Sequence, residues 1–183
     1  ALNSLGLAEY AYSRYAEVRA HYDEALSLLD TEAEPGRTAT LLGNIANIDY
    51  SLGDYAASRA RHEEALRYYR KAGDLRGEAG SLQGLARVAA DLHDLGQTEA
   101  LNLESLRLYR RLDDDNGASR SLIGLGLAAM ERSDFPRARA YTLEAREIKE
   151  RIGDRKGLAV VHYNLATFAN ATGELLEARE RAL

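Results

Sequence analysis

Cysteine is missing from the 183-residue chain, which excludes a disulfide framework, a thiolate metal site and a cysteine nucleophile. A chain without cysteine suits a reducing compartment, so we expect a cytoplasmic protein. Long apolar runs are missing too, because no uninterrupted apolar segment approaches the roughly 18 residues of a membrane span. The sequence therefore predicts no membrane protein, and its first residues show no signal-peptide pattern.

Proline occurs only twice, at Pro35 and Pro136. We expect Pro35 in a turn between helices and Pro136 in the first turn of a helix, where a missing N–H costs little. No segment alternates apolar and polar residues with the period of two that marks a half-buried strand. The sequence therefore favours an all-α fold.

Residue patterns for metal binding are also missing. No histidine is followed four residues later by a second histidine or a carboxylate, which is the spacing of a helical metal site. The segment from Asp113 to Gly117 resembles part of a calcium loop, but the first and twelfth ligand positions would hold Leu112 and Ile123. Neither side chain carries an oxygen ligand, so we expect this acidic segment to be the turn that starts a helix. The four histidines, of which we expect the first two to be surface or packing residues, are His21, His62, His93 and His162.

The sequence also has no catalytic motif in the structural context that its chemistry requires. The segment Gly124–Ala129 matches a dinucleotide fingerprint as text, but it follows no strand, and its glycines fall inside an expected helix. The chain has no P-loop and no G-x-S-x-G motif. We therefore expect no enzyme activity, no cofactor and no metal.

The net charge of −5 conceals an alternation along the chain. Basic and acidic residues number 3 and 7 in residues 11–50, 7 and 5 in residues 51–90, 4 and 7 in residues 91–130, and 8 and 6 in residues 131–170. No continuous basic stripe forms, so we expect no direct binding of nucleic acid by this segment.

What the chain does contain is a 40-residue unit that recurs along its length. Residues 51–90 align without insertion or deletion on residues 91–130 and 131–170, and backwards on residues 11–50. A fixed period in this range is the signature of a solenoid of stacked helical or strand units. Matching columns include the large residues Tyr15, Tyr55, Leu95, Phe135 and Leu175, and the small residues Ala25, Ala65, Ser105 and Ala145.

Each unit carries the start and stop signals of two helices. Asp54 is a good N-cap for one helix, and Gly53 is a good C-cap for the helix before it. The Gly73-Asp74 pair repeats this signal. Gly77, with Gly117 and Gly157 in the same column, serves either close packing or a turn. The predicted helices cover residues 1–12, 15–31, 37–52, 55–72, 76–92, 96–112, 117–132, 135–152, 157–172 and 174–183.

The core columns resemble the tetratricopeptide repeat. The segment from Asn44 through Leu52-Gly53-Asp54-Tyr55 to Leu66 carries that family's small, aromatic and Ala-Leu positions. The period is longer than the family's usual 34 residues, and a Gly-Asp turn replaces the proline that ends its second helix. This lengthened form resembles the repeat arms of bacterial LuxR-type activators and related signalling ATPases, and also animal peptide-binding scaffolds of spindle orientation and motor cargo adaptors.

The resemblance implies an all-α, right-handed superhelical solenoid of antiparallel helix pairs. We expect one solenoid over residues 1–183, cut from a longer chain. Its parts are a half repeat at 1–10, full repeats at 11–50, 51–90, 91–130 and 131–170, and a partial repeat at 171–183. Because cut solenoid ends expose apolar surface, we expect weak self-association through one end.

The second helix of each unit should bury one face and line the concave groove, the usual ligand surface of this family, with the other. One helical stripe of that groove, at Ile123, Leu127 and Met130, is apolar. It is either a binding groove flanked by Arg87 and Arg120 or core covered by neighbouring helices. The full set of expected groove residues is Asn47, Tyr50, Gln83, Arg87, Arg120, Ile123, Leu127, Met130, Tyr163 and Thr167.

An apolar centre with a basic rim suits an amphipathic or acidic peptide segment. We therefore expect a protein- or peptide-binding scaffold, the interaction arm of a larger bacterial signalling or transcription regulator. The alternative is an arm that senses a small-molecule effector.

Overall fold

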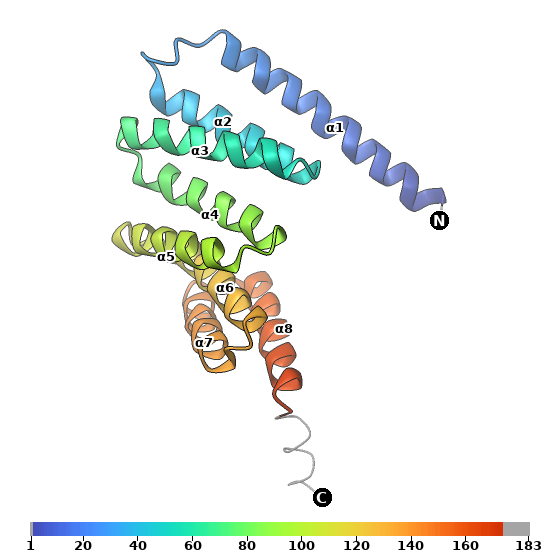
Figure 1. The fold of residues 1–183 in the computed structure, drawn as a ribbon, viewed down its shortest axis with the longest axis vertical. Helices are drawn as coiled ribbons and strands as arrows, with labels where there is room; N and C mark the ends of the chain where they lie inside the picture. Colours follow the sequence, from blue (N-terminus) through green and yellow to red (C-terminus); the bar gives the residue numbers. More distant parts are fainter. Residues whose placement is uncertain (1, 174–183) are drawn as a thin grey trace, which may run out of the picture. The chain divides into compact units, whose positions relative to one another are not determined.

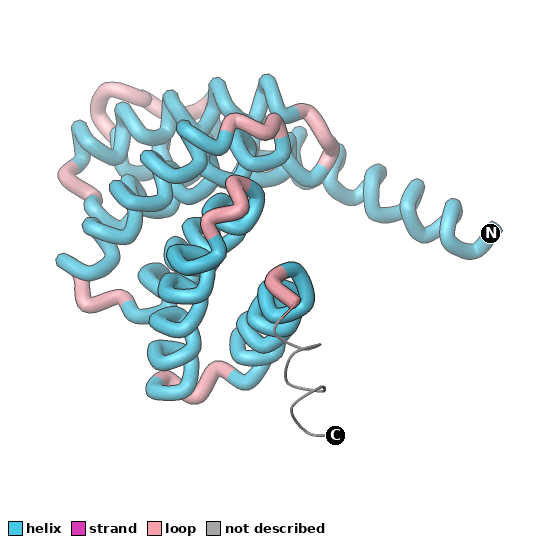
Figure 2. The backbone as a smooth tube through the Cα atoms, turned by 60° about the horizontal axis from the view of Figure 1, so that its bottom comes forward, coloured by secondary structure: helices cyan, strands magenta, loops and turns pink. Residues whose placement is uncertain are grey.

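The computed structural model describes the backbone of residues 2–173 and the side chains of residues 14–173, and every element in that part is an α-helix (Figures 1 and 2). The predicted helix 174–183 lies outside the described residues. The helices are α1 (Leu2–Ser27), α2 (Pro35–Ser51), α3 (Tyr55–Ala72), α4 (Leu75–Asp91), α5 (Leu95–Arg111), α6 (Asp115–Glu131), α7 (Phe135–Arg151) and α8 (Arg155–Ala171).

The chain divides into two compact units, Ala1–Val88 and Ala89–Leu183, and the boundary falls inside α4. The first unit contains α1, α2, α3 and most of α4, and the second contains α5 to α8. Short loops join neighbouring helices within each unit (Figure 2). The predicted single superhelix over both units stays a prediction.

One boundary prediction was wrong. The segments 1–12 and 15–31, expected as two helices, are joined in the single helix α1, which ends at Ser27 and whose first part extends past α2 and α3 (Figure 1). The reason lies in residues 12–14. Later repeats break their helices here with Leu52-Gly53-Asp54 or an equivalent triplet, whereas this one has Tyr-Ser-Arg. Without a left-handed glycine or a capping carboxylate, nothing in the sequence ends the helix.

The predicted Gly-Asp turns are confirmed. Each Asp accepts a hydrogen bond from the backbone N–H three residues on, at 2.9 to 3.2 Å, which satisfies an otherwise unpaired donor. The residue before the Asp has a positive φ, as at Gly53 with 81° and Asp113 with 51°. The acidic segment at Asp113 is therefore a helix-start turn, as expected. The six capping residues are Asp54, Asp74, Asp94, Asp114, Asp134 and Asp154.

Both prolines lie in the first turn of a helix. Pro136 does so as predicted. Pro35, which we expected in a turn, is instead the first residue of α2. At either place the missing N–H would have had no partner within the helix, and the fixed φ of proline suits the helix start.

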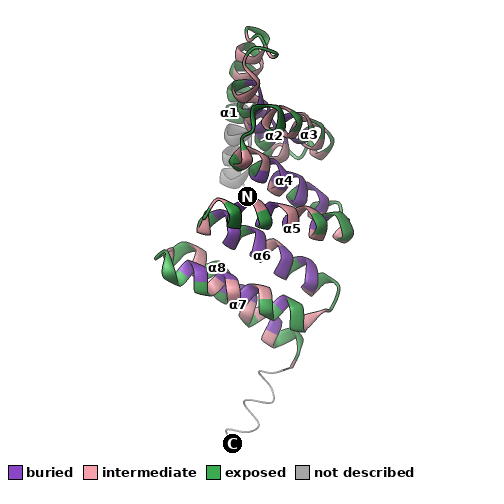
Figure 3. Ribbon diagram, turned by 90° about the vertical axis from the view of Figure 1, so that its left-hand side faces the viewer, coloured by how far each residue is buried: buried purple, intermediate pink, exposed green. Residues whose placement is uncertain are grey.

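The core follows the repeat columns. Ala65, Ser105 and Ala145 are fully buried, which lets neighbouring helices approach closely. Buried residues concentrate on α2, α4 and α6, as α2 and α6 show in Figure 3. The second helix of each repeat is here called the inner helix. The inner helices are α2, α4, α6 and α8, and the outer helices are α3, α5 and α7.

The glycines at the start of the inner helices serve close packing. A Cβ added at Gly77 would overlap the ring of Tyr69 from α3, and one added at Gly117 would overlap the ring of Tyr109 from α5. Neither glycine has a positive φ. The column is therefore glycine because an outer-helix side chain lies on its backbone, and a turn is not the reason.

Candidate ligand-binding face of the inner helices

All ten residues expected in the groove lie outside the buried core. Asn47, Arg87, Arg120, Leu127 and Tyr163 are exposed. The other five residues are half-buried, namely Tyr50, Gln83, Ile123, Met130 and Thr167. The face of each inner helix opposite the core is thus open within the described part of the chain.

In the first unit, three of these residues meet on α2 and α4. The Arg87 guanidinium lies over the ring of Tyr50, with 4.0 Å from Cζ to the ring centroid. Arg87 Nη2 donates a 2.8 Å hydrogen bond to Asn47 Oδ1, and Asn47 Nδ2 donates to the carbonyl of Gly43 at 3.0 Å. The ring of Tyr50 is in turn 5.5 Å from that of Tyr55. These contacts fix the arginine in one orientation.

The charge of Arg87 is not neutralised. Its partners within the described residues are a neutral amide and an aromatic ring, and no carboxylate lies within ion-pair distance. A guanidinium offers five N–H donors in a planar fork, so a ligand carboxylate can still be accepted by the remaining donors. Because the side chain is already ordered, binding costs less conformational entropy than it would for a free arginine.

In the second unit, the apolar stripe of α6 is divided between surface and core. Leu127 is 39% exposed, so it is not a core residue. Met130, in contrast, packs against a buried cluster of Ala129, Ala138 and Phe168. Ile123 is half-buried. The stripe therefore offers an apolar surface at Leu127 that is supported from below by the core.

Helix α8 adds a second apolar surface. Tyr163 is 72% exposed, and Val160, one turn earlier, is 50% exposed. Thr167 turns its hydroxyl back to the carbonyl of Tyr163, at 2.9 Å, so the helix backbone satisfies that group. The sequence analysis missed Val160, although its repeat position is that of Arg120 and the alignment alone would have found it.

A buried histidine lies beneath the first-unit face. His62 of α3 is 2% exposed, and its ring packs on the backbone of Gly84 in α4, where an added Cβ would overlap it. Neither ring nitrogen has a hydrogen-bond partner among the residues that the structure describes. Burial, and secondarily the positive charge of Arg87, lower the pKa of His62 to about 4. Of the two expected roles, surface or packing, His62 thus has the packing role, and it is neutral near pH 7.

A buried carboxylate anchors α1 to the same unit. Asp49 of α2 is fully buried. Asp49 Oδ2 lies 2.9 Å from Arg61 Nε of α3, and Asp49 Oδ1 lies 3.2 Å from Arg19 Nε of α1. Burial raises the pKa of Asp49, and the two arginines oppose that rise. The ion pairs hold α1 and α3 against α2, which carries Asn47 and Tyr50.

Metal and membrane chemistry find no support in the described residues. No three histidine, cysteine, aspartate or glutamate side chains of residues 14–173 lie close enough together to hold a metal ion. None of the helices described here is both long and apolar enough to cross a membrane.

Solved helical-repeat structures share this fold. The crystal structure of BtubC (BKLC) from P. vanneervenii is similar with a TM-score of 0.79 and 20% identity, over 91% of this chain and 70% of that one. A Rap protein complexed with Competence and Sporulation Factor is similar with a TM-score of 0.77 and 19% identity, over 96% of this chain and 49% of that one. This chain thus spans about half the length of the Rap protein. No family model and no curated protein matches the chain. The all-α solenoid fold of antiparallel helix pairs, similar to tetratricopeptide repeats, is confirmed.

Proposed function

We propose that this chain is a protein- or peptide-binding scaffold whose ligand lies on the open faces of the inner helices, the concave groove expected from the repeat family. The observation that carries the proposal is Arg87, which Asn47 and Tyr50 hold in place and no carboxylate of the described residues neutralises. The Rap structure, similar in fold, is a complex with Competence and Sporulation Factor. Binding by this segment needs no catalysis, cofactor or metal.

The proposed ligand is an extended or helical peptide with an acidic residue and apolar residues. A carboxylate would pair with Arg87 in the first unit, since charge-assisted hydrogen bonds to arginine are strong and bidentate. The second unit, taken by itself, offers Leu127, Val160 and Tyr163 to the apolar side chains of a ligand. Burying one such side chain contributes about 1.5–3 kcal/mol, so a few anchors supply much of a micromolar affinity.

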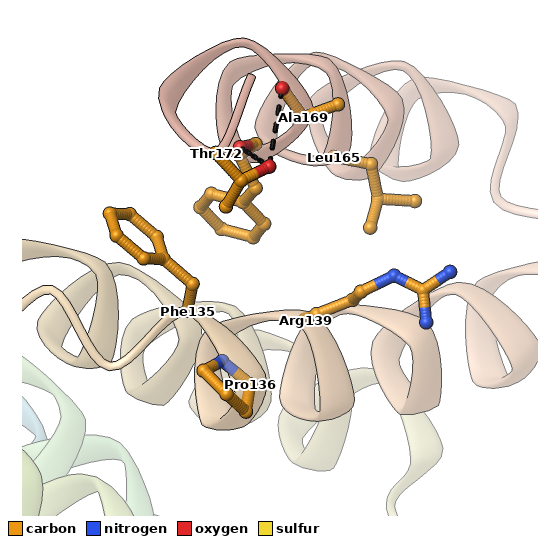
Figure 4. Close-up of a pocket in the computed structure, with 7 residues that line it drawn as sticks. Phe135, Pro136, Arg139, Leu165, Ala169 and Thr172 are labelled. Atoms are coloured by element: carbon orange, nitrogen blue, oxygen red, sulfur yellow. Dashed lines mark hydrogen bonds between the residues drawn. The ribbon is translucent and has the colours of Figure 1, made fainter. Parts of the chain in front are cut away.

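The regulatory setting is part of the same proposal. A bacterial signalling or transcription regulator would use this segment as its interaction arm, cytoplasmic and without direct nucleic-acid contact. An arm that senses a small-molecule effector is the alternative. The second unit has a pocket for such an effector between α7 and α8 (Figure 4). Its volume is about 230 Å³, which is below the range of about 300–1,000 Å³ typical of small-ligand sites.

A random peptide library displayed on phage tests the proposal. Selection on the immobilised protein should enrich peptides that combine an acidic residue with large apolar residues. Elution with a free acidic peptide should release them. Enrichment of basic peptides, or binding that survives replacement of both Arg87 and Leu127 by glutamine, would exclude this face as the ligand surface. Self-association through one end stays a prediction, and light scattering over a concentration series checks it.

A further inference from the structure

Helix α1 is attached to the first unit differently from the other helices. None of its side chains from residue 14 onward is buried, whereas every other helix buries at least three. Val18 is 41% exposed, although the residues in its repeat column, Ser58, Thr98 and Ala138, are 0% to 3% exposed. Fully buried side chains, which anchor the other helices, are thus missing from the described part of α1.

Charged side chains anchor α1 instead. Arg19 Nε lies 3.2 Å from Asp49 Oδ1 of α2, and Asp23 Oδ1 lies 3.8 Å from Arg61 Nη2 of α3. Arg19 and Asp23 are one turn apart and therefore lie on the same side of α1. The helix thus presents a positive and a negative charge to a surface with the opposite pattern. This surface selects a helix that carries an arginine and, four residues later, an aspartate.

The buried carboxylate of Asp49 makes the surface incomplete without such a helix. Asp49 stands in a column that holds alanine in the later repeats, namely Ala89, Ala129 and Ala169. Arg61 Nε donates a hydrogen bond to Asp49 Oδ2, but Oδ1 is buried and has no hydrogen-bond partner among the described residues. Because a buried charge without a partner is costly, this oxygen needs the arginine of an α1 helix, from its own chain or from another.

The connection between α1 and α2 lets that helix come from another copy. It comprises residues 28–34, whereas two or three residues join each later pair of helices. An extended chain spans about 3.3–3.6 Å per residue, so the opened connection reaches about 25 Å. None of its side chains is buried, and Leu28 is 82% exposed. Opening the connection therefore exposes no core residue.

We propose that two copies of this chain exchange α1, so that Arg19 and Asp23 of one copy pair with Asp49 and Arg61 of the other. A second copy carries the matching charges by identity, and the exchange is reciprocal, as the twofold symmetry of a dimer requires. Because α1 makes the same contacts in the closed and the exchanged form, protein concentration decides between the two. The exchange places the expected self-association at α1 and is independent of the proposed ligand face.

Cross-linking of isotope-labelled copies tests the exchange. In Arg61→Lys, a carbodiimide can join the new amine to the carboxylate of Asp23, which is 43% exposed. Unlabelled and heavy-nitrogen copies of this variant are mixed in equal amounts, unfolded, refolded together over a concentration series and then cross-linked. Glu32 and Lys71, a natural ion pair, show whether the reagent has worked. Mass analysis of the peptides identifies the cross-links that join a light chain to a heavy chain.

The exchange predicts mixed cross-links. Since exchanged copies pair at random, about half of the cross-links from Asp23 should join a light to a heavy chain at high concentration. Refolding at low concentration should lower that fraction, and sedimentation should show the dimer declining in parallel. Asp23 cross-links that stay within one isotope at every concentration would overturn the proposal, even if a dimer sediments. Their absence where Glu32 is joined to Lys71 would overturn it as well.

Discussion

Acidification should weaken the first unit through His62. The unfolded chain binds a proton at this histidine near the ordinary pKa of 6.5, whereas the folded state holds the pKa at about 4. The folded state therefore favours the neutral ring. The contribution to stability is fully present above pH 6.5 and is lost as the pH falls from about 6.5 to about 4.

The magnitude follows from the difference between the two pKa values. At roughly 1.4 kcal/mol per pKa unit, the full loss is about 3 kcal/mol, and about 2 kcal/mol of it falls between pH 7 and pH 5. The ring is 2% exposed and unpaired, so little solvent screening reduces this effect. Protonation would also place a second positive charge near Arg87.

The control variant is His62→Asn, because Asn102 occupies the same repeat position and packs on Gly124 as His62 packs on Gly84. Urea unfolding of both proteins, followed by circular dichroism at pH 7, 6 and 5, gives two pH profiles. The wild type should lose about 2 kcal/mol more than the variant between pH 7 and pH 5. Parallel profiles would refute the reasoning and would show that the ring is solvated or paired in solution.

Three further predictions concern two packing sites and metal binding. Gly77→Ala should destabilise the protein by about 1–3 kcal/mol through overpacking on Tyr69. The control Gly36→Ala should not destabilise it, because the new Cβ would lie 3.9 Å from the Cβ of Ala72. Thermal melting of the two variants measures the difference. Leu127→Glu should change stability by less than about 0.5 kcal/mol, and Leu122→Glu, at 0% exposure, should cost several kcal/mol. Equal losses in the second pair would place Leu127 in the core. A chelator should leave the melting temperature unchanged, and a clear drop would reveal a metal site.

Much of the fold was predictable because the repeats carry the same turn-forming features at the same positions. An aspartate that caps a helix and a residue with positive φ before it fix each turn locally, so Asp54 and its equivalents could be found from the sequence. The exception at residues 12–14 follows the same logic. The repeat alignment includes residues 11–50, but the Tyr-Ser-Arg triplet has neither a capping aspartate nor a residue of positive φ before it. Helix α1 therefore continues through the triplet.

The candidate face was only partly predictable. Helical spacing identified which side of α2 and α4 carries Asn47 and Arg87, since that depends on one helix at a time. The contact between them joins residues 40 positions apart and depends on how the two helices are placed. The burial of His62 has the same origin, because the ring fits only where Gly84 of another helix leaves room.

The direct test of the central claim is a comparison of two peptides on three proteins. A selected peptide with one aspartate and its asparagine twin are titrated, by fluorescence anisotropy, into the wild type, Arg87→Gln and Arg67→Gln. Arg67 is a matched control, because it is exposed on α3 and has no ion pair with the described residues. The wild type and Arg67→Gln should bind the aspartate peptide roughly tenfold or more tightly than its twin, as a charge-assisted hydrogen bond of about 1.5–3 kcal/mol requires. Arg87→Gln should lose that discrimination. Undiminished discrimination in Arg87→Gln would contradict the assignment of this face as the ligand surface.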